Sequence, residues 1–222
     1  MKPTRAAWFF AAGLAWLALR GILVHALPSL RADQIAQHGG LLLIIPLISV
    51  VASLTAPLFF FSFLLRHRFS KQRILQGATI FAASTALLSS VLVLISFIVT
   101  ASGSSTAEIP FVLSSPWLFQ AIPLLFVGSI FLFLTAFARQ SGCDASLRRS
   151  AGVAAIGTLI PTVMIAAWTL HSRFEGVLLW YPSFSESLVA KILGLAAAGA
   201  LLWFLETFAV SYDDGATSTD RG

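Results

Sequence analysis

The chain has little of what a disulfide-stabilised or soluble domain needs. Its 222 residues include one cysteine, Cys143, which excludes an intrachain disulfide and a CxxC redox motif. Only 10% of the residues are charged, whereas about a quarter are charged in soluble domains. No polar stretch is much longer than about a dozen residues, which is too short to bury a core of its own. We therefore expect no separate water-soluble domain.

Motifs of the common catalytic classes are missing as well. The sequence has no HExxH zinc motif, no GxSxG nucleophile elbow and no Walker A glycine loop. No apolar segment carries a pair of carboxylates that could act as general acid and base. We expect a non-catalytic protein, and an intramembrane enzyme of an unfamiliar type is the alternative.

Long apolar runs dominate the sequence, and 58% of the residues are hydrophobic. An α-helix needs roughly 20 apolar residues to cross the hydrocarbon core of a bilayer. Six segments reach this length: Ala6–Leu27, Gly40–Leu65, Gly77–Thr100, Trp117–Ala138, Ala151–Leu170 and Leu188–Val210. They are apolar throughout rather than alternating, which favours helices over strands. The sequence predicts an all-α, polytopic membrane protein with one six-helix transmembrane domain in residues 1–212 and a disordered polar tail in residues 213–222.

The distribution of Lys and Arg predicts the orientation, because short loops rich in these residues stay in the cytoplasm. With six spans, most basic residues fall on the side that holds both chain ends: Lys2, Arg5, Arg66, Arg68, Lys71, Arg73, Arg139, Arg148, Arg149 and Arg221. The loops of the other side hold only Arg31 and Arg173 as basic residues. Both termini are thus predicted to be cytoplasmic, and the net charge of +5 indicates contact with anionic lipid head groups rather than with nucleic acid.

The first span has a second interpretation. A basic start, the apolar stretch Ala6–Leu19 and the sequence Val24-His25-Ala26 are typical of a cleavable secretory signal. Five spans would remain if the segment were removed. We expect it to be retained as the first transmembrane helix.

Polar residues of four predicted spans fall at one depth, in the outer leaflet. These residues are Arg20, His25, Gln120, His171 and Lys191. If their helices surround a common space, they form a cationic pocket suited to an anionic solute, a lipid or a quinone. The alternative is that the long cationic side chains reach the interface without any partner. His25 and His171 could also serve as axial haem ligands, but neither their spacing nor their flanking residues support a haem, and we expect no cofactor and no metal.

Three further positions inside the spans are candidates for a role in function. Glu206 is the acidic residue of a span and is either a proton-coupling carboxylate or a side chain that reaches cytoplasmic water. Pro57 and Pro161 interrupt helical hydrogen bonding and predict kinks that could act as hinges. Small residues such as Ser90 and Gly194 allow close helix approach, so we expect the third and sixth spans to be well packed within the protein or its assembly.

Short loops, apolar spans and few ionisable groups favour a non-catalytic subunit, scaffold or assembly factor of a larger membrane complex, with membrane lipids and other membrane-protein subunits as partners. The alternative is a small transporter or permease that uses the outer-leaflet pocket. A strong bias of basic residues to one side is typical of the bacterial inner membrane, and an organellar membrane of bacterial descent is the second choice.

Overall fold

The computed structural model describes residues 3–26, 44–66, 72–101, 116–140, 144–174 and 188–218. Within these ranges every regular element is an α-helix. The six helices are α1 (Pro3–Ala26), α3 (Ile44–Arg66), α4 (Arg73–Ala101), α6 (Pro116–Ala138), α7 (Ala145–Phe174) and α9 (Leu188–Ser218). The predicted all-α class is confirmed, and each helix covers most of one predicted apolar segment.

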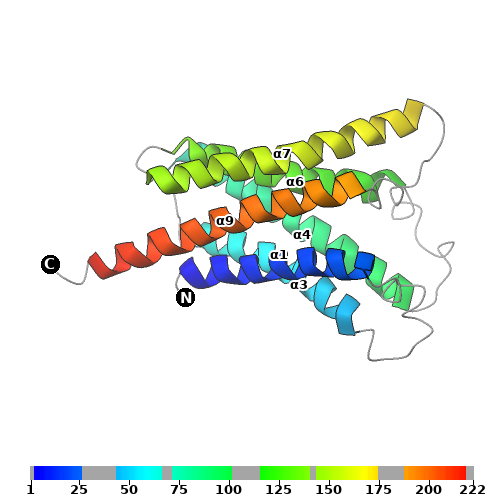
Figure 1. Cartoon of the computed structure of the whole chain (residues 1–222), viewed down its shortest axis with the longest axis horizontal. Helices are drawn as coiled ribbons and strands as arrows, with labels where there is room; N and C mark the ends of the chain where they lie inside the picture. The colour runs from blue at the N-terminus through cyan, green and yellow to red at the C-terminus, as the bar shows by residue number, and fades with distance from the viewer. Residues whose placement is uncertain are drawn as a thin grey trace.

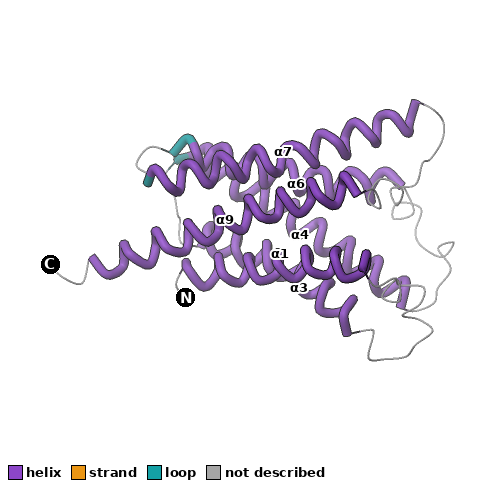
Figure 2. Tube along the Cα trace, in the orientation of Figure 1, coloured by secondary structure: helices purple, strands orange, loops and turns teal. Residues whose placement is uncertain are grey.

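The helices form a closed ring. Each helix makes its main contacts with two neighbours, in the order α1, α3, α4, α6, α7 and α9, and α9 returns to α1. Successive helices run in alternating directions, so that α1 begins and α9 ends at the same end of the bundle (Figures 1 and 2). The same end, called the arginine end below, holds these exposed side chains: Arg5, Arg66, Arg73, Arg139, Arg148 and Arg149.

Local sequence explains several helix boundaries. α6 begins at Pro116, whose fixed φ and missing N–H suit the first helical position. α7 follows Asp144, whose carboxylate accepts hydrogen bonds from the backbone amides of Ala145 and Ser146 and so caps the helix. α3 ends at Arg66, a cation that complements the partial negative charge of a helix C-terminus.

Phenylalanine rings fill the interior of the ring near the arginine end. They are buried and form what we call the phenylalanine cluster: Phe10, Phe60, Phe61, Phe133, Phe137, Phe204 and Phe208. The rings come from α1, α3, α6 and α9. Most neighbouring rings meet edge to face or tilted, with centroids 5.2 Å apart for Phe61 and Phe133 and 5.4 Å apart for Phe137 and Phe204. Such pairs add to the stability gained by burial alone, so the cluster joins four of the six helices.

The outward faces of the helices are also apolar. Large exposed side chains include Trp8, Ile74, Leu87, Ile156 and Val210. Among the described residues, two helical stretches are long and apolar enough to cross a membrane, Arg73–Leu92 and Ile192–Tyr212, and shorter apolar helices cover Thr55–Arg66 and Leu124–Ala138. These two stretches give weak support for a membrane protein. The six spans and their orientation stay a prediction.

The first and last helices extend beyond the predicted segments. The buried side chains of α1 include Ala6, Ala7 and Phe10, and α1 packs against both α3 and α9. The segment that could be read as a secretory signal is therefore part of the packed core. α9 continues to Ser218 and enters the segment predicted to be a disordered tail.

Candidate functional site

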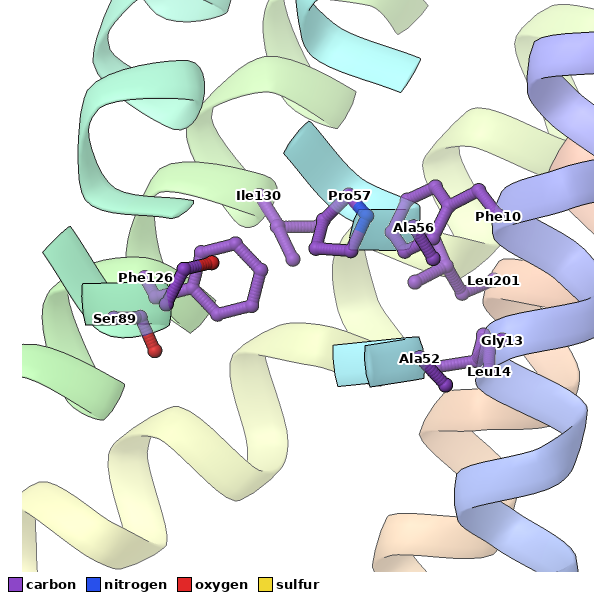
Figure 3. Close-up of a pocket in the computed structure, with 11 residues that line it drawn as sticks. Phe10, Gly13, Leu14, Ala52, Ala56, Pro57, Ser89, Phe126, Ile130 and Leu201 are labelled. Carbon is purple, nitrogen blue, oxygen red and sulfur yellow. The ribbon is translucent and has the colours of Figure 1, made fainter. Parts of the chain in front are cut away.

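A cavity of about 130 Å³ lies in the interior of the ring and is partly enclosed. Described residues of five helices line it, namely α1, α3, α4, α6 and α9. Figure 3 shows Ser89 and Phe126 on one side, Gly13 and Leu14 on the opposite side, and Pro57 between them. The cavity therefore extends across the bundle from α4 and α6 to α1.

The cavity exists because small side chains face the interior at this level. These are Gly13 on α1, Ala52 and Ala56 on α3, and Ser89 and Ser90 on α4. The rest of the described lining is apolar and uncharged. The site can therefore hold an apolar group, and the described part of its lining supplies two side-chain hydroxyls, those of Ser89 and Ser90.

Gly13 sets the distance between α1 and α3. A Cβ atom added at Gly13 would lie 2.6 Å from the Cβ of Ala56 and 3.4 Å from the backbone oxygen of Ala52. Only a glycine permits so close an approach, since real Cβ atoms do not come this near to one another. Gly157 allows a similar but looser approach of α7 to α9, where the nearest atom would be the Cβ of Ala200 at 3.1 Å.

Buried hydroxyls close to the cavity join α4 to α6. Thr85 Oγ1 and Ser129 Oγ lie 2.7 Å apart and share a hydrogen bond. One hydroxyl donates this bond, and the other donates its own proton to a backbone carbonyl of its helix, which is that of Phe81 or Ala82 for Thr85 and that of Phe126 for Ser129. An interhelical bond of this kind contributes about 0.6 kcal/mol on average in a membrane bundle. The pair therefore has a structural role, since it links α4 to α6.

The residues of the predicted outer-leaflet pocket lie on four helices, toward the same end of the bundle. Arg20 and His25 lie in the last turns of α1, Gln120 near the start of α6, His171 near the end of α7 and Lys191 near the start of α9. These turns all lie toward the end opposite the arginine end. Their side chains lie outside the described residues, so their convergence on one pocket stays a prediction.

Of the two prolines inside predicted spans, Pro57 is buried in α3 and lines the cavity. Pro161 lies within α7, and its side chain is outside the described part of the structure. Their role as hinges stays a prediction.

Glu206 is exposed on the outward face of α9, on the same face as Trp203 and Val210. The neighbouring residues Leu205 and Phe208 point into the core. A carboxylate within an apolar span usually faces the bundle interior or a water-filled cavity, and Glu206 does neither. Its role in proton coupling stays untested.

Metal-ligating residues do not gather among the described side chains, where no group of three or more His, Cys, Asp or Glu residues could hold an ion. The side chains of His25 and His171, and Cys143 as a whole, lie outside the described residues.

The pKa of Asp144, the residue that caps α7, is lowered in the folded protein. The hydroxyl of Ser146 donates a hydrogen bond to Asp144 Oδ2, and this bond, with the two backbone amides, lowers the pKa of Asp144 below its ordinary value of 3.8. Desolvation acts in the opposite direction without cancelling the effect. The folded state therefore binds this proton more weakly than the unfolded state does. The resulting stabilisation is fully present above the ordinary value and is lost as the pH falls through the lowered pKa.

We expect Ser146→Ala to raise the pKa of Asp144 toward 3.8, because the variant removes the largest cause of the shift. A carbon-13 NMR titration of the carboxyl groups measures this pKa directly, with Asp144→Asn to identify the resonance. Ser62→Ala, an exposed serine near the end of α3, is the control and should leave the titration unchanged. An Asp144 that titrates alike in the wild type and in Ser146→Ala would contradict the assignment.

Sequence reasoning missed the cavity and the phenylalanine cluster. A usable signal was present, because phenylalanines occur in pairs at the arginine end of three helices: adjacent as Phe60 and Phe61, and one turn apart as Phe133 with Phe137 and Phe204 with Phe208. The small residues that form the cavity lie about one to two turns further along the same interior. Comparison with known proteins adds no relative, since no protein-family model, no curated protein and no solved structure matches the chain.

Proposed function

We propose that the chain is a six-span protein of a bacterial inner membrane with both ends in the cytoplasm, and that it works as a non-catalytic subunit, scaffold or assembly factor of a larger membrane complex. The arginine end supports the orientation, because basic residues beside spans are retained in the cytoplasm. The two stretches that are long and apolar enough to cross a bilayer support the membrane location.

The outward position of Glu206 is the observation that favours a subunit. Insertion scales place the cost of a charged residue such as aspartate at roughly 2.5–3.5 kcal/mol at a span centre, and we expect a smaller cost at Glu206, which lies between Phe204 and Phe208 toward the arginine end. Glu206 lies inside the apolar stretch Ile192–Tyr212 and is exposed on the outer face of the ring. A partner helix that covers this face and supplies a hydrogen-bond donor would remove that cost.

The surrounding face of α9 is suited to such a helix. Gly199 lies about two turns from Glu206 on the same face, and a Cβ atom there would meet nothing within 4 Å. Small residues let helices approach closely in lipid, and aromatic residues provide contact area. Beside the carboxyl group of Glu206, Gly199 permits close approach of a partner helix and Trp203 provides contact area.

Native mass spectrometry of the tagged protein, released gently from its membrane, tests the proposal. We expect a foreign chain in stoichiometric amount with the wild type and its loss with Glu206→Leu. The amount of inserted protein should stay equal or rise, because leucine is favoured in lipid. If Glu206 merely reached water or lipid, the leucine variant would keep every companion of the wild type.

A matched pair of aromatic substitutions separates this face from the rest of the surface. Trp203 on α9 is 42% exposed and Phe81 on α4 is 41% exposed. We expect Trp203→Ala to weaken the complex and Phe81→Ala to leave it intact. A wild-type protein that is released alone, or as a homo-oligomer with a bound lipid or anion, would overturn the subunit proposal.

The second candidate is a small transporter or permease for an anionic solute, a lipid or a quinone. The cavity across the bundle favours the lipid or the quinone, because its described lining is apolar and uncharged. Under this proposal Arg20→Ala abolishes transport without lowering the amount of folded protein. Full transport by the Arg20→Ala variant would show that the outer-leaflet pocket is not needed for transport.

A further inference from the structure

We propose that the interior cavity binds the end of a hydrocarbon chain, supplied by a membrane lipid or by an isoprenoid carrier. This inference rests on the membrane location proposed above but not on any protein partner. Among the described residues, the lining is apolar apart from Ser89 and Ser90 and has no charged side chain. A phosphate or carboxylate head group would meet no cation from this described lining, so the site is suited to a tail.

The size of the cavity fits a chain end rather than a whole molecule. Its volume of about 130 Å³ is close to the roughly 150 Å³ of an engineered apolar cavity that stays dry and binds benzene. A water molecule needs two to four polar partners to be retained in such a site, and the described lining supplies two side-chain polar groups, the hydroxyls of Ser89 and Ser90. Hydrocarbon is therefore the better occupant, and a surrounding bilayer supplies it.

The phenylalanine cluster determines the direction in which a chain can enter. Phe10 both lines the cavity and contacts the rings of Phe60 and Phe61, with centroid distances of 5.4 and 6.2 Å. Phe133 and Phe204, also members of the cluster, lie one turn beyond the lining residues Ile130 and Leu201 on α6 and α9. These rings close the interior toward the arginine end. A chain therefore enters from the opposite end or between two helices, with its tip against the cluster.

Photo-crosslinking in lipid nanodiscs tests this binding. The full-length protein is reconstituted with a phospholipid whose diazirine sits at the chain terminus, and in a parallel sample with a polyisoprenoid bearing a terminal diazirine. We expect labelling of the cavity lining, around Ser89 and Ile130, as well as of outward residues such as Leu87. Labelling of the lining by the phospholipid identifies a lipid acyl chain, and labelling by the polyisoprenoid alone identifies an isoprenoid carrier.

Two serines on the same helix provide a matched pair of variants. Ser89 lines the cavity, whereas Ser84 is exposed on the outer face of α4. Ser89→Leu fills the cavity and should reduce labelling of the lining about tenfold, a change of one decade in occupancy, while Ser84→Leu leaves it unchanged. Leu201→Ala enlarges the cavity and should increase the labelling, which keeps the test decisive if Ser89→Leu fails to fold.

The outcomes separate this inference from the proposed function. Labelling of outward residues with none in the lining, or equal labelling of the lining in the wild type and in Ser89→Leu, overturns the chain-binding proposal but leaves the membrane location intact. Failure of the folded protein to enter nanodiscs or to label at any outward residue overturns the membrane location itself.

Discussion

Phe133→Ala is expected to cause the largest loss of stability of any single substitution considered for this chain. Phe133 is 1% exposed and its ring contacts those of Phe60, Phe61, Phe137 and Phe204. In the proposed membrane, lipid tails are as apolar as the protein interior, so the loss comes from vanished packing and a new void rather than from contact with water. We expect the free energy of unfolding to fall by about 3 kcal/mol, at the lower end of the range for buried phenylalanines replaced by alanine.

Titration of the purified protein with a denaturing detergent, followed by circular dichroism, measures this loss. Phe81→Ala is the control, since Phe81 is 41% exposed and its removal should change the stability by no more than about 0.5 kcal/mol. Phe133→Leu should recover a large part of the loss because it refills most of the space. Equal shifts for Phe133→Ala and Phe81→Ala would show that the phenylalanine cluster does not hold the ring together.

Gly13→Ala is expected to push α1 away from α3. The added methyl group would lie 2.6 Å from the Cβ of Ala56, an atom fixed to the backbone that cannot turn aside, so the two helices must separate. Overpacking of this kind costs up to about 3 kcal/mol. Alanine regains about 1 kcal/mol through its higher helix propensity, which leaves a net loss of about 2 kcal/mol.

The matched control for Gly13→Ala is Gly152→Ala on α7, where the new methyl group would meet nothing within 4 Å. Its stability should equal or exceed that of the wild type, because only the gain in helix propensity applies. Ala56→Gly in the Gly13→Ala background should restore much of the loss, since it removes the opposing Cβ. If the double variant is as unstable as Gly13→Ala alone, the close approach of α1 and α3 is not the cause.

The all-α class followed from the sequence, and each described helix covers most of one predicted segment, but some helix ends did not follow from it. The fifth predicted span began at Ala151, after the last arginines, whereas α7 begins at Ala145. Hydropathy marks the part of a helix that suits lipid, while the helix itself starts where its first amides find a cap. Asp144, a preferred capping residue followed by a helical run, was the signal that could have located this start.

The interior of the bundle was beyond prediction for a different reason. The helices are apolar on all sides, so no face could be recognised as inward from the sequence. Ser90 is buried, as expected for the third span, but Gly194 and Ala196 of the last span are exposed on the ring. They do not pack closely within the chain, and their packing within an assembly stays a prediction. The cavity depends on the rotation of five helices, which no single segment determines.

The closed ring determines which helix contact can form last as the chain is synthesised. α1 leaves the ribosome first and α9 last, yet each is the other's neighbour. Until α9 is inserted, the interior surface of α1, which includes Phe10, has α3 on one side and lacks its second neighbour. The final step of assembly is therefore a long-range contact, the kind that costs most chain entropy and forms late. A chain truncated before α9 would form an open arc with its phenylalanine cluster uncovered. α9 is therefore the helix that closes the ring.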